Sequence, residues 1–173
     1  PGLYWWKVRA VGRNELPMSS WSEPREFKVT APVTFAALGD SITHGGGAVS
    51  TPPGYLMYDW DSYSAVPVKN LGFSGDTVDA MLERFDTDVL AFSPRVLVIM
   101  GGVNNFREGG TAAHIIKVLA QIRERCRVNR IVPVFVTAAP INPDLMAGAY
   151  GMETPTPGWR KQQLLLNDWI MRQ

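Results

Sequence analysis

Four short apolar runs, each closing on a glycine or a polar loop, constrain the fold of this chain most strongly. The third run is rich in β-branched residues and stops at a pair of glycines. Runs that are apolar at nearly every residue are typical of parallel strands buried on both faces. The expected strands cover residues 33–38, 66–70, 95–100 and 131–137.

The segments between these runs carry apolar residues with the spacing of an amphipathic helix. One helix is expected over 78–89, with Asp76 or Thr77 as its N-cap. A second is expected after Thr111, and a third over 159–173. Strands that alternate with helices predict a three-layer α/β sandwich with right-handed crossovers.

Residues 1–31 have a different pattern and are expected to be separate from the domain over 33–173. Alternating side chains over 4–10 and a second extended stretch over 23–29 predict a β-hairpin. The hairpin resembles the last two strands of a fibronectin type III module. Two strands alone are marginally stable in water, so we expect a partial module or a hairpin that packs on the main domain.

Composition and charge exclude several classes of protein. The 17 basic and 16 acidic side chains are spread along the chain, so no patch for nucleic acid is expected. No apolar run approaches the ~20 residues of a membrane span. The single Cys126 cannot form an internal disulfide, and only two histidines are present, so neither a metal site nor a cofactor is expected. Cys126 is expected to be a small buried side chain.

Three loops with unusual residues follow the first three expected strands. Ser41 follows Gly39 and Asp40 on a tight turn, Gly75 lies just before a helix, and Asn104 follows a glycine pair. Ligands bind parallel sheets beyond the carboxyl ends of the strands, where these loops should converge. A hydroxyl beside several N–H donors suits acyl transfer, which needs a nucleophile and an oxyanion hole. Asp40 is expected to accept hydrogen bonds from loop amides.

These loops together resemble the sequence blocks of the SGNH, or GDSL-type, hydrolase superfamily over residues 33–173. Residues 39–45 match the first block, whose serine, here Ser41, is the nucleophile. Gly75, within 70–77, matches the oxyanion glycine of the second block. In the third block, which starts at Gly102, Asn104 falls on the oxyanion asparagine, and Asn105 stands where aspartate is more usual. The resemblance implies a flavodoxin-like α/β/α fold and ester hydrolysis.

One landmark of that family, a late Asp-x-x-His that supplies the base and its orienting acid, does not occur in the sequence. We therefore expect the chain to stop before its own base. His44 is a poor substitute on a short turn, and His114 is expected on a helix surface. Ser74 is a rival nucleophile, but its surroundings lack the second glycine of an α/β-hydrolase elbow. We interpret it as loop structure.

Two long segments, 46–63 and 140–158, are expected to shape substrate choice. In the first, Tyr55, Tyr58 and Trp60 could stack on sugars or hold an acyl chain. The alternative is that these aromatic side chains pack on one another.

The sequence thus predicts a serine hydrolase of carboxylic esters, either a lipolytic enzyme or thioesterase or a carbohydrate O-acetylesterase. Its expected substrate is a small ester or an acylated polysaccharide, and its expected location is extracellular or at the cell surface, with the cytoplasm left open. A carbohydrate-binding module that has lost catalysis is the alternative. A nucleotide-binding protein is disfavoured because no phosphate loop is present. A domain without its last strand exposes a sheet edge, so a homodimer is also expected.

Overall fold

The computed structural model of the chain divides it into two units, Pro1–Pro32 and Val33–Gln173. The structure describes residues 3–13, 16–28, 33–45, 63–143 and 157–173. Tyr55, Tyr58 and Trp60, which the sequence suggested for substrate binding, lie outside the described residues.

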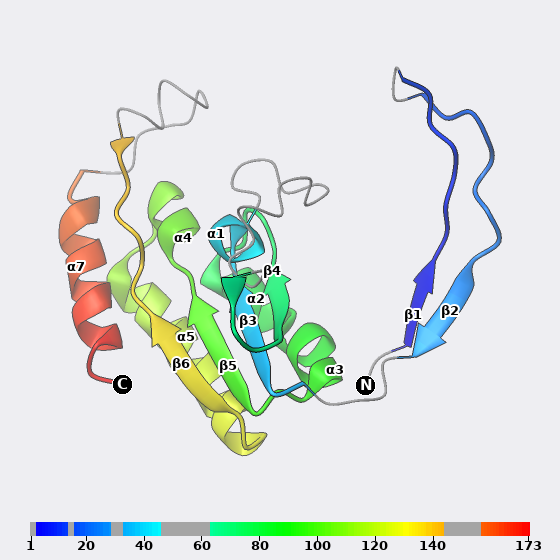
Figure 1. The fold of residues 1–173 in the computed structure, drawn as a ribbon. Coiled ribbons are helices and arrows are strands. Elements are labelled where there is room, and N and C mark those ends of the chain that lie inside the picture. The colour runs from blue at the N-terminus through cyan, green and yellow to red at the C-terminus, as the bar shows by residue number, and fades with distance from the viewer. Residues whose placement is uncertain (1–2, 14–15, 29–32, 46–62, 144–156) are drawn as a thin grey trace. The chain divides into compact units, whose positions relative to one another are not determined.

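The first unit is an antiparallel hairpin (Figure 1). Strands β1 (Leu3–Trp6) and β2 (Arg25–Lys28) pair along their whole length, and the rings of Tyr4 and Phe27 stack at 5.4 Å. Farther along, isolated bonds such as Met18 N to the Ala10 carbonyl oxygen (2.9 Å) hold the two segments together. The predicted hairpin is confirmed, although its strands are shorter than the stretches expected from the sequence. Its likeness to a fibronectin type III module stays a prediction.

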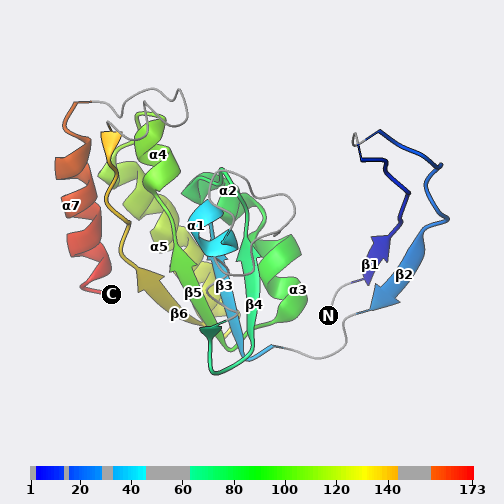
Figure 2. The ribbon, with the colours of Figure 1, turned by 45° about the horizontal axis from the view of Figure 1, so that its top comes forward.

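The second unit is built on a parallel sheet with strand order β4-β3-β5-β6 (Figure 2). The sequence located all four strands, although each ladder begins one or two residues later than its apolar run. Because β3 lies between β4 and β5, the loops that follow these three strands leave the same edge side by side. The strands are β3 (Phe35–Gly39), β4 (Val68–Gly72), β5 (Val96–Met100) and β6 (Val132–Val136).

Helices connect the strands, and their starts follow from capping side chains. Thr77 caps the N-terminus of α2 through Ala80 N, and Thr111 caps α5 through His114 N. Helix α5 contacts both α2 and α7, so these three form a row against the sheet. The helices of the unit are α1 (Ser41–His44), α2 (Val78–Glu83), α3 (Leu90–Phe92), α4 (Val103–Arg107), α5 (Ala112–Val128) and α7 (Trp159–Ile170).

The prediction of one continuous helix over 78–89 is wrong. After α2, a π-helical turn, η3 (Phe85–Val89), precedes α3. The change occurs at Arg84, whose φ and ψ of −86° and 7° end the α-helical geometry and whose side chain contacts the sheet edge. The apolar spacing is the same in both forms, since Phe85 and Val89 remain buried, so periodicity could not reveal the turn.

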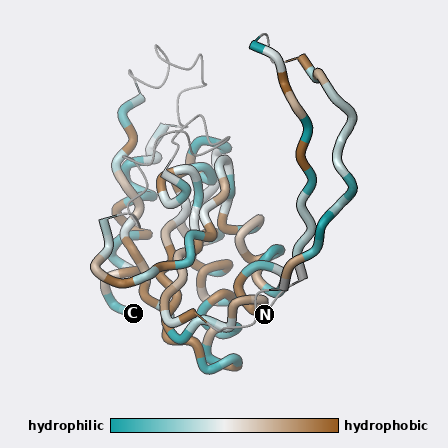
Figure 3. The backbone as a smooth tube through the Cα atoms, turned by 45° about the vertical axis from the view of Figure 1, so that its right-hand side comes forward, coloured by the Kyte–Doolittle hydropathy of each residue, from teal (hydrophilic) through white to brown (hydrophobic). Residues whose placement is uncertain are grey.

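The core lies between the sheet and the row of helices, and the apolar segments of the unit appear in brown in Figure 3. Leu97 and Ile99 are fully buried there. Cys126 is buried as expected, and this burial raises the pKa of its thiol to about 12. On the edge strand, Val132 and Val134 are 57% and 44% exposed. Within the described part of the chain, no helix is long and apolar enough to span a membrane.

Candidate active site

The turn that carries Ser41 follows directly from the central strand β3. Asp40 caps α1 by accepting a 2.9 Å hydrogen bond from Ile42 N, as the sequence predicted, and Ser41 is the first residue of the helix. A Cβ on Gly39 would lie 2.0 Å from Oγ1 of Thr43, so only glycine lets this turn close against the strand. Burial raises the pKa of Asp40, which is 1% exposed.

The second loop, which carries Gly75, follows β4. Phe73 N donates a 2.9 Å hydrogen bond to the carbonyl oxygen of Gly39 and ties this loop to the Ser41 turn. Gly75 has a φ of +88°, and a Cβ there would meet nothing within 4 Å. Its conformation therefore requires glycine, and the exposed backbone at this point is open to a ligand.

The third loop leads from β5 through Gly102 into α4. Gly102 has a φ of +112° and precedes the helix. Asn104 is 5% exposed and donates from Nδ2 to the backbone oxygen of Asp76 at 2.8 Å. Its Oδ1 accepts a 2.8 Å hydrogen bond from Nη1 of Arg107. The side-chain amide of Asn104 thus lies against the residue that follows Gly75.

Several N–H donors at this edge have no hydrogen-bond partner among the residues that the structure describes. Among the described residues, none accepts a hydrogen bond from the backbone N–H of Ser41 or of Gly75. The Nδ2 group of Asn104 has two hydrogens, of which Asp76 uses one. In the described part of the chain, each of the three adjacent loops thus carries one N–H hydrogen without an acceptor.

Asn105 has a different position from its neighbour. Its Oδ1 accepts from Val78 N at 3.0 Å, and its Nδ2 donates to Oδ2 of Asp79 at 3.0 Å. The other oxygen of Asp79 lies 2.8 Å from Nε2 of His114, which is on the surface of α5 as expected. Asn105 therefore holds the start of α2, and its contacts are structural.

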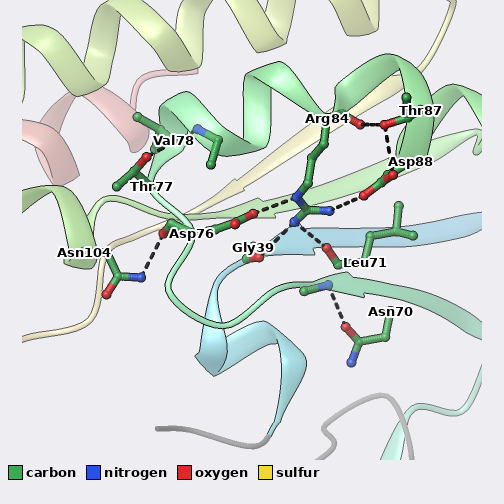
Figure 4. A network of polar contacts seen from close by, with 12 residues as sticks. Gly39, Asn70, Leu71, Asp76, Thr77, Val78, Arg84, Thr87, Asp88 and Asn104 are labelled. Carbon is green, nitrogen blue, oxygen red and sulfur yellow. Dashed lines mark hydrogen bonds and ion pairs between the residues drawn. The ribbon is translucent and has the colours of Figure 1, made fainter. Parts of the chain in front are cut away.

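Arg84 connects the loops beneath the candidate site (Figure 4). Its Nε donates to Oδ2 of Asp76 at 2.7 Å, and its Nη1 to Asp88 at 2.9 Å. Its Nη2 donates to the carbonyl oxygens of Leu71 at 2.7 Å and Gly39 at 3.3 Å. Burial raises the pKa of Asp76, and the hydrogen bond and charge of Arg84 oppose that rise.

Within the described residues, neither histidine is hydrogen-bonded to the Ser41 hydroxyl. Nδ1 of His44 is buried without a hydrogen-bond partner, and His114 pairs with Asp79 instead. Ser74 lies in the turn before Gly75, as the loop interpretation expected.

A cleft of about 410 Å³ opens beyond β6, on the edge of the sheet from which the three loops leave. It is lined on one side by Trp159 and Arg160 at the start of α7 and by the buried Gln163. Its size lies in the range of small-ligand sites, which is about 300–1,000 Å³. An aromatic ring, a cation and an amide are suited to a polar ligand with an apolar face.

Sequence reasoning missed both arginines that organise the site. Arg84 lies within a helical segment, and the only sequence signal was Asp88 four residues later, a spacing common to surface ion pairs. Arg107 carried no signal. The carbonyl oxygens that Arg84 contacts belong to strands β3 and β4, which approach it only in the folded chain, and Arg107 contacts Asn104 on its own short helix.

The fold is that of known hydrolases. A G-D-S-L family lipolytic protein from Desulfitobacterium hafniense DCB-2 superposes with a TM-score of 0.61 at 22% identity, over 81% of this chain and 70% of the other. A GDSL-like lipase from Bacteroides thetaiotaomicron VPI-5482 superposes with a TM-score of 0.61 at 24% sequence identity, over 83% of this chain and 66% of the other. An acetyl xylan esterase, AlAXEase, superposes with a TM-score of 0.55 at 19% sequence identity, over 81% of this chain and 73% of the other. No curated protein sequence matches the chain.

At these identities the likeness concerns the fold, an α/β fold built on a parallel sheet. Residues 37–172 match the model of the GDSL-like lipase/acylhydrolase family. The chain belongs to that family, as the blocks around Ser41, Gly75 and Asn104 predicted. The catalytic roles of these three residues stay predictions.

Proposed function

We propose that this chain hydrolyses carboxylic esters through an acyl-enzyme on Ser41, with O-acetyl groups of polysaccharides as the preferred substrates. The observation that carries the proposal is that the loops after three adjacent strands each carry an N–H hydrogen without an acceptor among the described residues: that of Ser41, that of Gly75 and one hydrogen of the Asn104 amide. Donors held in place before the reaction stabilise the negative charge that develops on the carbonyl oxygen.

In the first step, Oγ of Ser41 forms a bond to the carbonyl carbon while its proton leaves to a base. The tetrahedral oxyanion accepts hydrogen bonds from the three donors. The bond to the alcohol oxygen then breaks, and the alcohol leaves with the proton. Water repeats the sequence and releases the acid. The family resemblance assigns the base to a histidine of an Asp-x-x-His motif, which residues 1–173 do not contain.

The preference for polysaccharide esters rests on the cleft beyond β6. The cleft beside Trp159 has an aromatic ring and polar side chains, which suit a sugar. The likeness to an acetyl xylan esterase agrees with this, although at 19% identity it concerns the fold alone. An extracellular or cell-surface location and a homodimer remain part of the proposal.

The test is intact mass after treatment with a fluorophosphonate, in wild type, Ser41→Ala and Ser74→Ala. We expect a single adduct in wild type and Ser74→Ala and none in Ser41→Ala. An adduct that persists in Ser41→Ala would overturn the role of Ser41.

A second candidate is a carbohydrate-binding module without catalysis. In its favour, neither histidine forms a hydrogen bond with Ser41 within the described residues. The expected signature is the absence of an adduct together with binding of an O-acetylated glycan that remains acetylated, which isothermal calorimetry and acetate release would detect.

A further inference from the structure

One side chain, that of Arg84, donates hydrogen bonds to the ends of two adjacent strands at the C-terminal edge of the sheet. The parallel ladder between β3 and β4 stops at Gly39 and Gly72, and beyond it the Gly39 carbonyl oxygen accepts a hydrogen bond from Phe73 N on the next loop. A carbonyl oxygen can accept two hydrogen bonds, and Nη2 of Arg84 donates to the Gly39 oxygen as a second donor and to the Leu71 oxygen of the neighbouring strand. Arg84, which lies between α2 and η3, therefore joins the ends of two adjacent strands.

The same guanidinium also holds the Gly75 loop. Its Nε lies 2.7 Å from Oδ2 of Asp76, the residue directly after Gly75. The Asp76 carboxylate is 7% exposed and the Arg84 side chain 17%, so water screens this pair little. The backbone oxygen of Asp76 in turn accepts the bond from Asn104.

We infer that Arg84 is a positioning residue that sets the distance between the Ser41 turn and the Gly75 and Asn104 donors. It acts through Gly39, two residues before Ser41, and through Asp76, one residue after Gly75. This inference rests on the proposed function, because the donors matter only if Ser41 attacks an ester. A guanidinium can do this because its nitrogens point in fixed directions, whereas the single ammonium of lysine cannot reach all of these acceptors.

The test compares Arg84→Lys with a matched control, Arg125→Lys. Arg125 forms an exposed ion pair with Asp86 at 2.7 Å and makes no hydrogen bond to the three site loops. Both variants keep the charge, so a difference between them reports the geometry of the guanidinium at position 84. A further variant, Arg84→Met with Asp76→Asn, removes the pair without leaving a buried charge and serves if Arg84→Lys does not fold.

Hydrogen exchange by mass spectrometry gives the first readout. We expect faster exchange over 39–43 and 71–77 in Arg84→Lys and in the double variant, with α5 unchanged, and no change over these segments in Arg125→Lys. Unchanged exchange in both segments would overturn the inference. An increase in the exchange rate that is uniform across the second unit would also overturn the inference, because Arg84 would then stabilise the domain without positioning the site.

Ester hydrolysis gives the second readout. Misplacement by about 1 Å can cost on the order of 10²-fold in rate, so we expect a loss of that order in kcat for Arg84→Lys with a much smaller change in KM. An unchanged kcat in an active protein would refute the positioning role. A wild type that hydrolyses no ester would refute the proposed function instead, and the exchange result would still decide whether Arg84 orders the two loops.

Discussion

Arg107 donates a 2.8 Å hydrogen bond from Nη1 to Oδ1 of Asn104, and this bond determines which end of the Asn104 amide faces the Gly75 loop. With Oδ1 held by Arg107, Nδ2 points to Asp76 and keeps one hydrogen for a ligand. If the amide were turned the other way, its oxygen would face the oxyanion, and the two negatively polarised oxygens would repel each other. The orientation of this donor is therefore set by a neighbour on the same short helix.

The first prediction concerns that neighbour. In Arg107→Met, the amide of Asn104 keeps only its bond to Asp76, so its orientation is less well fixed. We expect kcat for ester hydrolysis to fall about tenfold, the equivalent of one hydrogen bond of about 1.4 kcal/mol. Steady-state kinetics on a small acetyl ester measure this loss. An unchanged kcat would mean that Asp76 alone orients the amide.

The second prediction separates the two adjacent asparagines. Asn104→Ala removes a donor from the site, and we expect kcat to fall by about 10²–10³. Asn105→Ala leaves Val78 N unpaired and should lower the free energy of unfolding by about 1–3 kcal/mol, with a smaller effect on kcat. Kinetics and urea denaturation of both variants test the contrast. Equal effects of the two variants on kcat would exclude a special role for Asn104.

The third prediction compares two glycines that the structure requires for different reasons. Gly75→Ala places a methyl group in open space but at a φ of +88°, which costs about 1–2 kcal/mol of unfolding free energy. Gly39→Ala brings Cβ within 2.8 Å of the Met100 backbone oxygen as well as close to Thr43, so we expect a loss of about 3 kcal/mol or more. Urea denaturation midpoints should rank the variants in that order, and the reverse ranking would contradict these assignments.

The order of strands and helices was predictable because apolar periodicity records which faces are buried. The runs around Leu38 and Val98 and the spacing in α5 needed no knowledge of distant partners. The three strand-end loops could also be predicted, since glycines and polar residues at those points interrupt the apolar pattern. The family blocks then added a role for each loop.

The remaining features depend on tertiary contacts that no local pattern records. The π-helical turn keeps Phe85 and Val89 buried, so its apolar spacing is the same as that of an α-helix. Arg84 donates to a carbonyl oxygen of another strand, that of Leu71. Arg107 donates to the side chain of Asn104, whose orientation also depends on the Gly75 loop. Sequence reasoning could identify the chemical groups at the site but not what holds them.

The fourth prediction is a pH dependence of stability caused by Asp76. Burial raises its pKa in the folded protein above the ordinary value of 3.8, so the folded state binds the proton more tightly than the unfolded state. This contribution to stability is fully present below pH 3.8 and is lost as the pH rises to the folded pKa. The unfolding free energy of wild type minus that of Asp76→Asn should therefore be largest in acid and decrease with rising pH. Urea titrations across this range test the sign, and a difference that increases with pH would contradict it.

The last prediction concerns substrate choice at the cleft beyond β6. If Trp159 stacks on a sugar, Trp159→Ala should raise KM for an O-acetylated polysaccharide about two- to tenfold, as expected for an aromatic contact of about 0.5–1.5 kcal/mol. The KM for p-nitrophenyl acetate should not change, because this small ester does not need to reach the cleft. Lys161→Ala is the matched control, since Lys161 is exposed on the same turn of α7 and does not line the cleft. Equal shifts in KM for both substrates would indicate that Trp159 supports the fold of the site, and no shift for either would exclude the cleft as a sugar subsite.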